Sequence, residues 1–104
     1  MDEETKFVNR LIELRQQKGV SARDMSLSLG QSESYINKIE NHKSLPSLTG
    51  FFYICEFFRI TPNEYFNYDN KNPTLTNEFI KEFYKLKSSE SKHILEIIKD
   101  LNKD

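Results

Sequence analysis

The chain has 104 residues, of which 37% are hydrophobic and 30% are charged, and this fits a single small domain with a modest core and a wet surface. No apolar run is long enough to span a bilayer, and the acidic start MDEETK lacks the pattern of a signal peptide. The single cysteine cannot form an internal disulfide. We therefore expect a cytoplasmic protein that does not associate with a membrane. The net charge is −1, and residues 1–70 carry eight basic and ten acidic side chains, so any nucleic-acid partner requires the positive charge to be gathered on one face.

The first predicted helix runs from about Glu3 to Lys18. Its apolar side chains Phe7, Leu11 and Leu14 recur at helical spacing and form one stripe. Gly19 follows the last helical residue, where a glycine commonly ends a helix with a positive φ. The pattern therefore predicts a long amphipathic helix that packs one face on a core.

Two short amphipathic helices follow, each preceded by a serine that can cap its first turn. Ser21 precedes ARDMSLSL, Ser32 precedes ESYINKIE, and the turn between them contains Gly30. Two short helices joined by a glycine-containing turn are the plan of the helix-turn-helix motif, whose second helix enters the major groove of DNA. Pro46 marks the loop that ends this part of the chain.

A fourth helix is predicted from about Leu48 to Arg59, and its residues are apolar on most sides. We therefore expect it to be the most buried helix. Thr61 and Pro62 read as a cap and a first helical residue that open a short fifth helix. The polar stretch YDNKNPT then indicates a boundary near residues 69–74.

Two further helices complete the predicted fold, each with one apolar face. A helix pair so short and so apolar must pack on the first five helices or on a second chain. The predicted fold class is thus all-α, with a five-helix domain over residues 1–69 and a C-terminal two-helix hairpin over residues 70–104. The candidate dimerisation residues on the hairpin are Phe79, Phe83, Ile94, Ile97, Ile98 and Leu101.

The sequence offers no support for enzyme activity. It contains no glycine-rich phosphate loop, no Ser/His/Asp arrangement and no carboxylate pair that stands out. His42 and His93 lie far apart, with no cysteine or carboxylate at metal-ligand spacing. Cys55 lies on an apolar helix, which favours a buried structural thiol over a nucleophile. We expect no enzyme, no cofactor and no metal.

Residues from about Val8 to Phe66 resemble the lambda-repressor/Cro-like (Xre) helix-turn-helix family of prokaryotic and phage type. The resemblance rests on the order and spacing of several motifs over roughly sixty residues. In chain order they are Leu11-x-x-Leu14-Arg15, Lys18-Gly19-Val20-Ser21, Met25-x-x-x-Leu29-Gly30, Ser32-x-x-Tyr35-Ile36-x-x-Ile39-Glu40, Lys43-x-x-Pro46-Ser47-Leu48 and Ile60-Thr61-Pro62-x-Glu64-x-Phe66. The resemblance implies a lambda-repressor-like DNA-binding domain.

The resemblance also implies roles for individual residues. Arg15 and Glu40 should form an internal ion pair that is common in this family. DNA contacts should come from the starts of the second and third helices and from the loop after the third. These positions are Ala22, Arg23, Glu33, Ser34, Asn37, Lys38, Asn41, His42, Lys43 and Ser44.

Four residues of this region depart from the family pattern or leave alternatives open. The family usually has glutamine where Ala22 stands and glycine where His42 stands. Glu33 either accepts a hydrogen bond from cytosine N4 or weakens DNA binding and points to another partner. Tyr35 either places its hydroxyl on a phosphate or packs in the core.

We therefore expect a sequence-specific regulator of transcription that binds double-stranded DNA, a repressor that recognises an inverted-repeat operator as a homodimer. The alternative is a protein-interaction module on the same fold, such as an antitoxin or an anti-repressor, which the acidic first domain, Ala22 and Glu33 motivate. We expect no separate ligand-sensing domain in residues 71–104. A signal would act through the C-terminal helices, through dimerisation or through a second regulatory protein.

Overall fold

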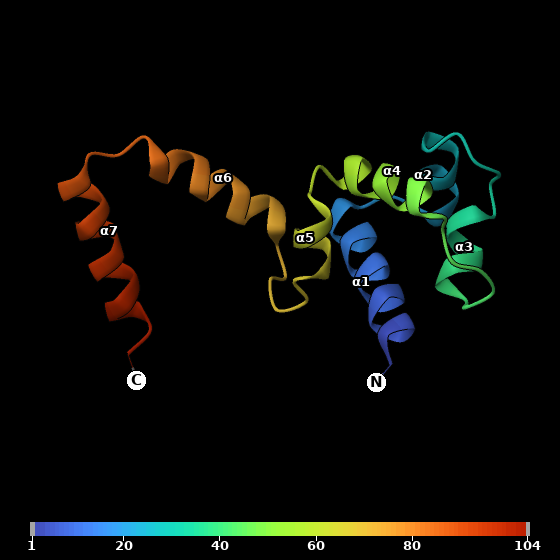
Figure 1. The fold of residues 1–104 in the computed structure, drawn as a ribbon, viewed down its shortest axis with the longest axis horizontal. Helices are drawn as coiled ribbons and strands as arrows, with labels where there is room; N and C mark the ends of the chain where they lie inside the picture. Colours follow the sequence, from blue (N-terminus) through green and yellow to red (C-terminus); the bar gives the residue numbers. More distant parts are fainter. Residues whose placement is uncertain (1, 104) are drawn as a thin grey trace. The chain divides into compact units, whose positions relative to one another are not determined.

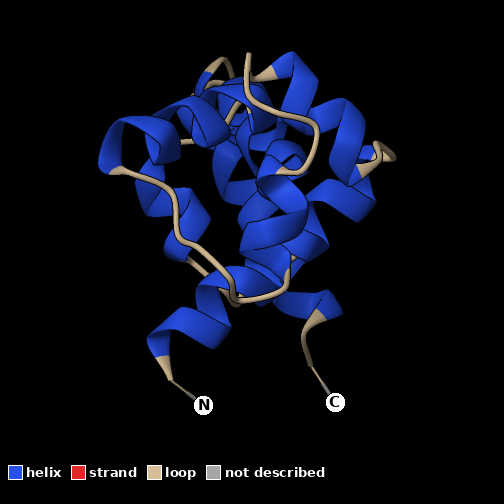
Figure 2. Cartoon of the chain, turned by 90° about the vertical axis from the view of Figure 1, so that its right-hand side faces the viewer, coloured by secondary structure: helices blue, strands red, loops and turns tan. Residues whose placement is uncertain are grey.

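The computed structural model describes residues 2–103, which form helices joined by loops, with no strand in this range (Figures 1 and 2). The predicted all-α class is confirmed. Contacts divide the chain into a first unit, Met1–Pro73, and a second unit, Thr74–Asp104. No helix within residues 2–103 is long and apolar enough to cross a bilayer. The helices are α1 (Glu3–Lys18), α2 (Ala22–Ser28), α3 (Tyr35–Glu40), α4 (Leu48–Phe58), α5 (Pro62–Phe66), α6 (Pro73–Tyr84) and α7 (Ser88–Leu101).

Helix α1 has the predicted bounds because both of its ends are capped. The Asp2 carboxylate accepts a hydrogen bond from the Thr5 N–H at 2.8 Å, and this bond lowers the pKa of Asp2. At the other end Gly19 has φ +75°, and its N–H reaches the last carbonyls of the helix. Helix α5 also begins as predicted, since Thr61 and Glu64 form a capping box and Pro62 is the first helical residue.

The core of the first unit is a single cluster of apolar side chains from α1 to α5. Helix α2 packs against α3, α1 packs against α3 and α5, and α4 packs against α5. Tyr65 is completely buried, and its hydroxyl donates to the Phe7 carbonyl at 2.8 Å, which satisfies its polar end. The buried apolar residues are Val8, Leu11, Leu14, Met25, Ile36, Ile39, Phe51, Ile54, Cys55, Phe58, Ile60 and Tyr65.

The prediction for α4 is only partly correct. Its buried side is as expected, and burial raises the pKa of the Cys55 thiol to about 11, which keeps the thiol protonated and unreactive. However, Leu48, Phe52 and Tyr53 are exposed, so one apolar side of this helix faces solvent and is not covered by the other helices of the first unit. Helix α4 has more apolar side chains than the other four short helices of the first unit can cover.

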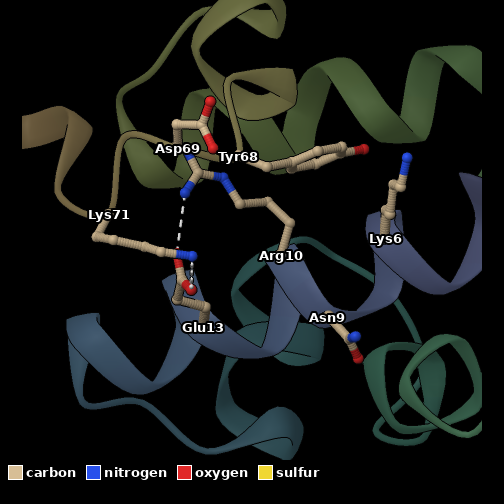
Figure 3. A pocket seen from close by; sticks show the side chains of 7 residues that line it. All are labelled: Lys6, Asn9, Arg10, Glu13, Tyr68, Asp69 and Lys71. Atoms are coloured by element: carbon tan, nitrogen blue, oxygen red, sulfur yellow. Dashed lines mark hydrogen bonds and ion pairs between the residues drawn. The ribbon is translucent and has the colours of Figure 1, made fainter. Parts of the chain in front are cut away.

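Arg10 is a buried cation that fastens the end of the first unit to α1. Its Nε donates to the Tyr65 carbonyl at 2.8 Å, its Nη1 to Glu13 and the Asn70 carbonyl, and its Nη2 to the carbonyls of residues 64 and 67. Figure 3 shows Arg10 and Lys71 both meeting the Glu13 carboxylate beside a cavity of about 400 Å³. The Gln17 side chain also donates to the Lys71 carbonyl. These bonds hold residues 64–71 on the surface of α1.

The second unit has no core of its own. None of the described residues 74–103 is buried, and the ring pair Phe79–Phe83 is stacked with centroids 6.0 Å apart. In Figure 1 helix α7 turns away from α6 after Tyr84 instead of lying back along it, and the predicted hairpin is not confirmed. Helix α7 begins at Ser88, and the Lys87 N–H before it donates to the Glu90 carboxylate at 2.9 Å.

Candidate nucleic-acid interface

A buried hydroxyl sets the angle between α2 and α3. Ser26 Oγ donates to the Ala22 carbonyl at 2.7 Å and accepts from the Ile36 N–H at 2.9 Å. It therefore joins the middle of α2 to the first turn of α3. At the ends of α2, Ser21 Oγ accepts from the Asp24 N–H, and Gly30 has φ +72° in the turn that follows.

The start of α3 differs from the prediction. The regular helix begins at Tyr35, and the Tyr35 N–H donates to the Ser32 carbonyl at 3.1 Å across a turn. The prediction that the Ser32 side chain caps this helix is wrong, because the helix starts three residues after it and no side-chain cap hydrogen bond precedes Tyr35. Glu33 and Ser34 consequently lie in the turn before α3 rather than in its first helical turn.

Arg15 and Glu40, the pair that the family resemblance implied, meet in two hydrogen bonds. Arg15 Nε and Nη2 lie 2.6 and 3.0 Å from the two carboxylate oxygens of Glu40, and Nη1 donates to the Val20 carbonyl at 2.9 Å. The bond to Glu40 raises the pKa of Arg15. The pair ties the end of α3 to α1 and fixes how α3 is presented.

The outer face of α3 carries polar side chains that the core does not use. Asn37 and Lys38 are exposed, and Ser34 is half-buried. Asn41, one turn later, donates from Nδ2 to the Asn37 carbonyl at 2.8 Å and to Asn37 Oδ1 at 3.0 Å. Asn41 thus braces the Asn37 amide and leaves the amide's own N–H₂ group free to donate.

His42 turns the chain at the end of α3. It has φ +59°, the left-handed conformation that a glycine adopts more easily, which explains why the family commonly has glycine there. Two backbone bonds close the turn, from the Lys43 N–H to the Lys38 carbonyl at 2.8 Å and from the His42 N–H to the Ile39 carbonyl at 3.0 Å. This turn presents His42, Lys43 and Ser44 to solvent.

Tyr35 lies half-buried beside the first turn of α4. A Cβ placed on Gly50 would lie 2.7 Å from the Tyr35 hydroxyl, so the glycine makes room for the ring. Desolvation raises the pKa of Tyr35. The ring packs against the core cluster, and a hydroxyl contact with phosphate remains a prediction.

Ion pairing involves more than half of the basic side chains of the first unit. Within residues 2–73 five basic side chains have carboxylate partners, and these are Lys6, Arg10, Arg15, Arg23 and Lys71. Lys38 and Lys43 have no such partner in this range, and both lie in α3 or the loop after it. Lys18 covers the Phe57 ring instead, and Arg59 ends α4 with φ +58°. Two of the four basic side chains without a carboxylate partner in residues 2–73 therefore lie on α3 or the loop after it.

The roles of two residues and of one ion pair were not predicted from the sequence. Arg10 looked like an ordinary helix-surface charge, Ser26 like a polar residue on α2, and the bond between Arg23 and Glu33 had no local signal because ten residues separate them. The candidate DNA-contacting residues all lie on α2, α3 and their adjoining loops. The candidate dimerisation residues lie on α6 and α7 of the second unit. Within residues 2–103 no group of three or more metal-ligating side chains comes together.

Comparison with protein families places most of the first unit in a known class. Residues 8–71 match a family described as a helix-turn-helix domain. Comparisons with curated proteins and with solved structures gave no match. The matched range extends from the buried Val8 of α1 to Lys71, which is the end of the segment that Arg10 and Gln17 fasten.

Proposed function

The chain belongs to the helix-turn-helix family of the Xre/Cro-like kind, and on this premise we propose that it is a transcriptional repressor that binds an inverted-repeat operator as a homodimer. The helix-turn-helix domain indicates a DNA-binding regulator, while the sign of regulation, the operator and the dimer are our proposal. The observation that carries the proposal is that Asn37 and Lys38 of α3 and Lys43 of the loop after it are exposed, with their side-chain N–H groups available to donate.

In the proposed complex α3 lies in the major groove. Asn37 presents an amide N–H₂ group held in place by Asn41, and Lys38 presents an unpaired ammonium one residue further on. Asparagine is suited to adenine N6 and N7, and lysine to guanine or to phosphate. Lys43 in the following loop would contact the DNA backbone, where its charge displaces counterions.

The second unit supplies the proposed dimer contact. Ile97 and Leu101 are 54% and 80% exposed, although both are large apolar side chains on a helix with a clear apolar face. Soluble proteins rarely leave such a face in water, and a second copy of the same helix is self-complementary to it. A dimer would place two α3 helices about 34 Å apart, one turn of DNA.

The first test is a selection of binding sites from random double-stranded DNA by the purified full chain at two salt concentrations. We expect an inverted repeat whose affinity falls steeply with salt, because phosphate contacts release counterions. If a folded, helical preparation enriches no sequence, the proposal fails. The protein-interaction alternative, in which the chain acts as an antitoxin or an anti-repressor, would then be favoured.

A double variant tests the role of α3 directly. Asn37→Ala with Lys38→Ala should weaken operator binding by at least about thirtyfold, since each base contact contributes about 1–3 kcal/mol. The matched control is Asn102→Ala with Lys103→Ala, which removes the same two chemical groups from the residues that follow α7. Equal affinities for the two double variants, with unchanged circular dichroism, would show that α3 is not the recognition helix.

A further inference from the structure

Arg23 of α2 and Glu33 of the turn before α3 form an ion pair on the helix-turn-helix surface. Arg23 Nε donates to Glu33 Oε2 at 3.1 Å, and the two side chains are 67% and 66% exposed. Water screens a pair this exposed, so it contributes little to folding. A structural role therefore does not account for two opposite charges at this place.

The pair leaves specific atoms available to a ligand. The hydrogen bond uses Arg23 Nε and one oxygen of Glu33. Within residues 2–103 no other group bonds to the two Nη groups of Arg23 or to Oε1 of Glu33. The Arg23–Glu33 pair thus offers guanidinium donors next to one carboxylate acceptor. The hydrogen bond to Glu33 holds the guanidinium in place.

This arrangement matches the major-groove edge of one base pair. A G·C pair shows two acceptors, guanine N7 and O6, followed by one donor, the N4 amino group of cytosine. Arginine binds the two guanine acceptors through two N–H groups, and a glutamate accepts from the cytosine amino group. An A·T pair places its donor between acceptors and does not fit a row of two donors and one acceptor.

We propose that Arg23 and Glu33 act together as one reading unit for a G·C base pair in each operator half-site. The inference rests on the proposed function and adds a base identity to it. Arg23 binds guanine, and Glu33 binds cytosine and also positions the Arg23 guanidinium. Because the pair has no net charge, it gains little from the phosphate backbone, so it contributes to sequence preference more than to general affinity.

The test compares variants of the full chain on the selected operator. The half-site G·C pairs are replaced by A·T one at a time, and dissociation constants are measured for the unmodified protein, Arg23→Gln, Glu33→Gln and the double variant. We expect one G·C pair whose replacement weakens binding of the unmodified protein about tenfold to a hundredfold. Each single variant should lose most of that preference, and the double variant should lose no more than either single one.

Lys43→Gln is the matched control, because it removes one exposed charge from the same surface. It should weaken binding equally on all sequences and reduce the salt slope by about one, while the G·C preference stays. Circular dichroism should be unchanged for all variants, since each altered side chain is exposed.

Three results would overturn the proposal. If Arg23→Gln behaves like Lys43→Gln, Arg23 is a phosphate contact only. If Glu33→Gln raises affinity equally for all sequences, Glu33 only shields its neighbour's charge. Both results leave operator binding intact, so they contradict the reading unit alone. Failure of the unmodified protein to select any sequence would overturn the reading unit together with the proposed function.

Discussion

The first unit and the second unit satisfy their polar and apolar groups in opposite ways. In residues 2–73 a contiguous apolar cluster is closed by long-range bonds, such as those of Arg10 to carbonyls more than fifty residues away. In residues 74–103 nothing is buried, and the ion pairs described there join residues only three apart in the sequence. The first unit contains the contacts that a stable domain needs, whereas the second has an apolar face and only local support.

The difference indicates which part depends on an additional surface. Short helices held by local pairs alone are marginal in water, because nucleation costs more than a few exposed pairs return. We therefore expect variants in the first unit to change the free energy of unfolding and variants in the second to change association. Four predictions follow this contrast, in order of decreasing effect on unfolding.

The largest effect is expected for Arg10→Met. Methionine fills similar space but removes the Arg10 donors from four backbone carbonyls, of which those of residues 64 and 67 still accept from a backbone N–H. The first unit should therefore lose about 3–5 kcal/mol of unfolding free energy. Urea denaturation followed by circular dichroism measures the loss. The control is Lys85→Met in the exposed Lys85–Glu82 pair, where we expect a change below about 0.5 kcal/mol. Similar losses in both variants would remove the contrast between the units.

The Arg15–Glu40 pair should follow. Its two side chains are 17% and 11% exposed, so Arg15→Gln or Glu40→Gln should each cost about 2–3 kcal/mol by leaving a poorly solvated charge. A double-mutant cycle on urea midpoints measures the coupling, which we expect to be at least about 1 kcal/mol. Additive losses would mean that the two side chains contribute separately and that the pair does not fix α3.

His42→Gly should have a smaller effect of opposite sign. Relief of the left-handed conformation favours glycine, the added freedom of the unfolded chain opposes it, and we expect a net gain of about 0.5–1 kcal/mol. Gly19→Ala is the reciprocal variant, since Gly19 has φ +75° with open space where a Cβ would be. It should lose about 1 kcal/mol through conformation alone. Destabilisation by His42→Gly would show that the imidazole makes a contact that outweighs the strain.

The smallest effect on the first unit is expected for Ile97→Asp with Leu101→Asp. Hydrogen exchange of the amides in residues 8–66 should be unchanged, while sedimentation should show monomers where the unmodified chain forms dimers, because charges then interrupt the apolar face of α7. Lys92→Asp, at an exposed position of the same helix, replaces a positive by a negative charge without removing a large apolar side chain and should still dimerise. Dimers that survive the double substitution would place the association elsewhere.

Local sequence signals were sufficient for most of the helices. Asp2 and Gly19 fix the ends of α1, and Thr61 with Pro62 fixes the start of α5, because caps act within a few residues of where they stand. The start of α3 was predicted less well. Serine is a residue type that commonly caps a helix, but residues 32–34 form a turn and α3 begins only after it.

The contacts that organise the candidate site were not predictable from local pattern. Arg10 occupies a position on an amphipathic helix where a solvated charge is the ordinary expectation, and only the folded chain brings the carbonyls of residues 64–70 to it. The bond between Arg23 and Glu33 likewise needs the angle that Ser26 sets between α2 and α3. The family resemblance, in contrast, implied the Arg15–Glu40 pair because it carries information about the whole fold.

The position of Arg10 has a consequence for synthesis on the ribosome. Its side chain is made early, but its carbonyl partners lie between residues 64 and 70. The Arg10 guanidinium of a nascent chain must therefore stay hydrated until Asn70 has left the exit tunnel. Only then can Arg10 be buried with all its carbonyl partners and the first unit complete its fold. A transcript cut short before that point would release a chain with a complete helix-turn-helix sequence but without the carbonyl partners of Arg10. We expect such a chain to be a substrate for proteases that remove unfinished proteins.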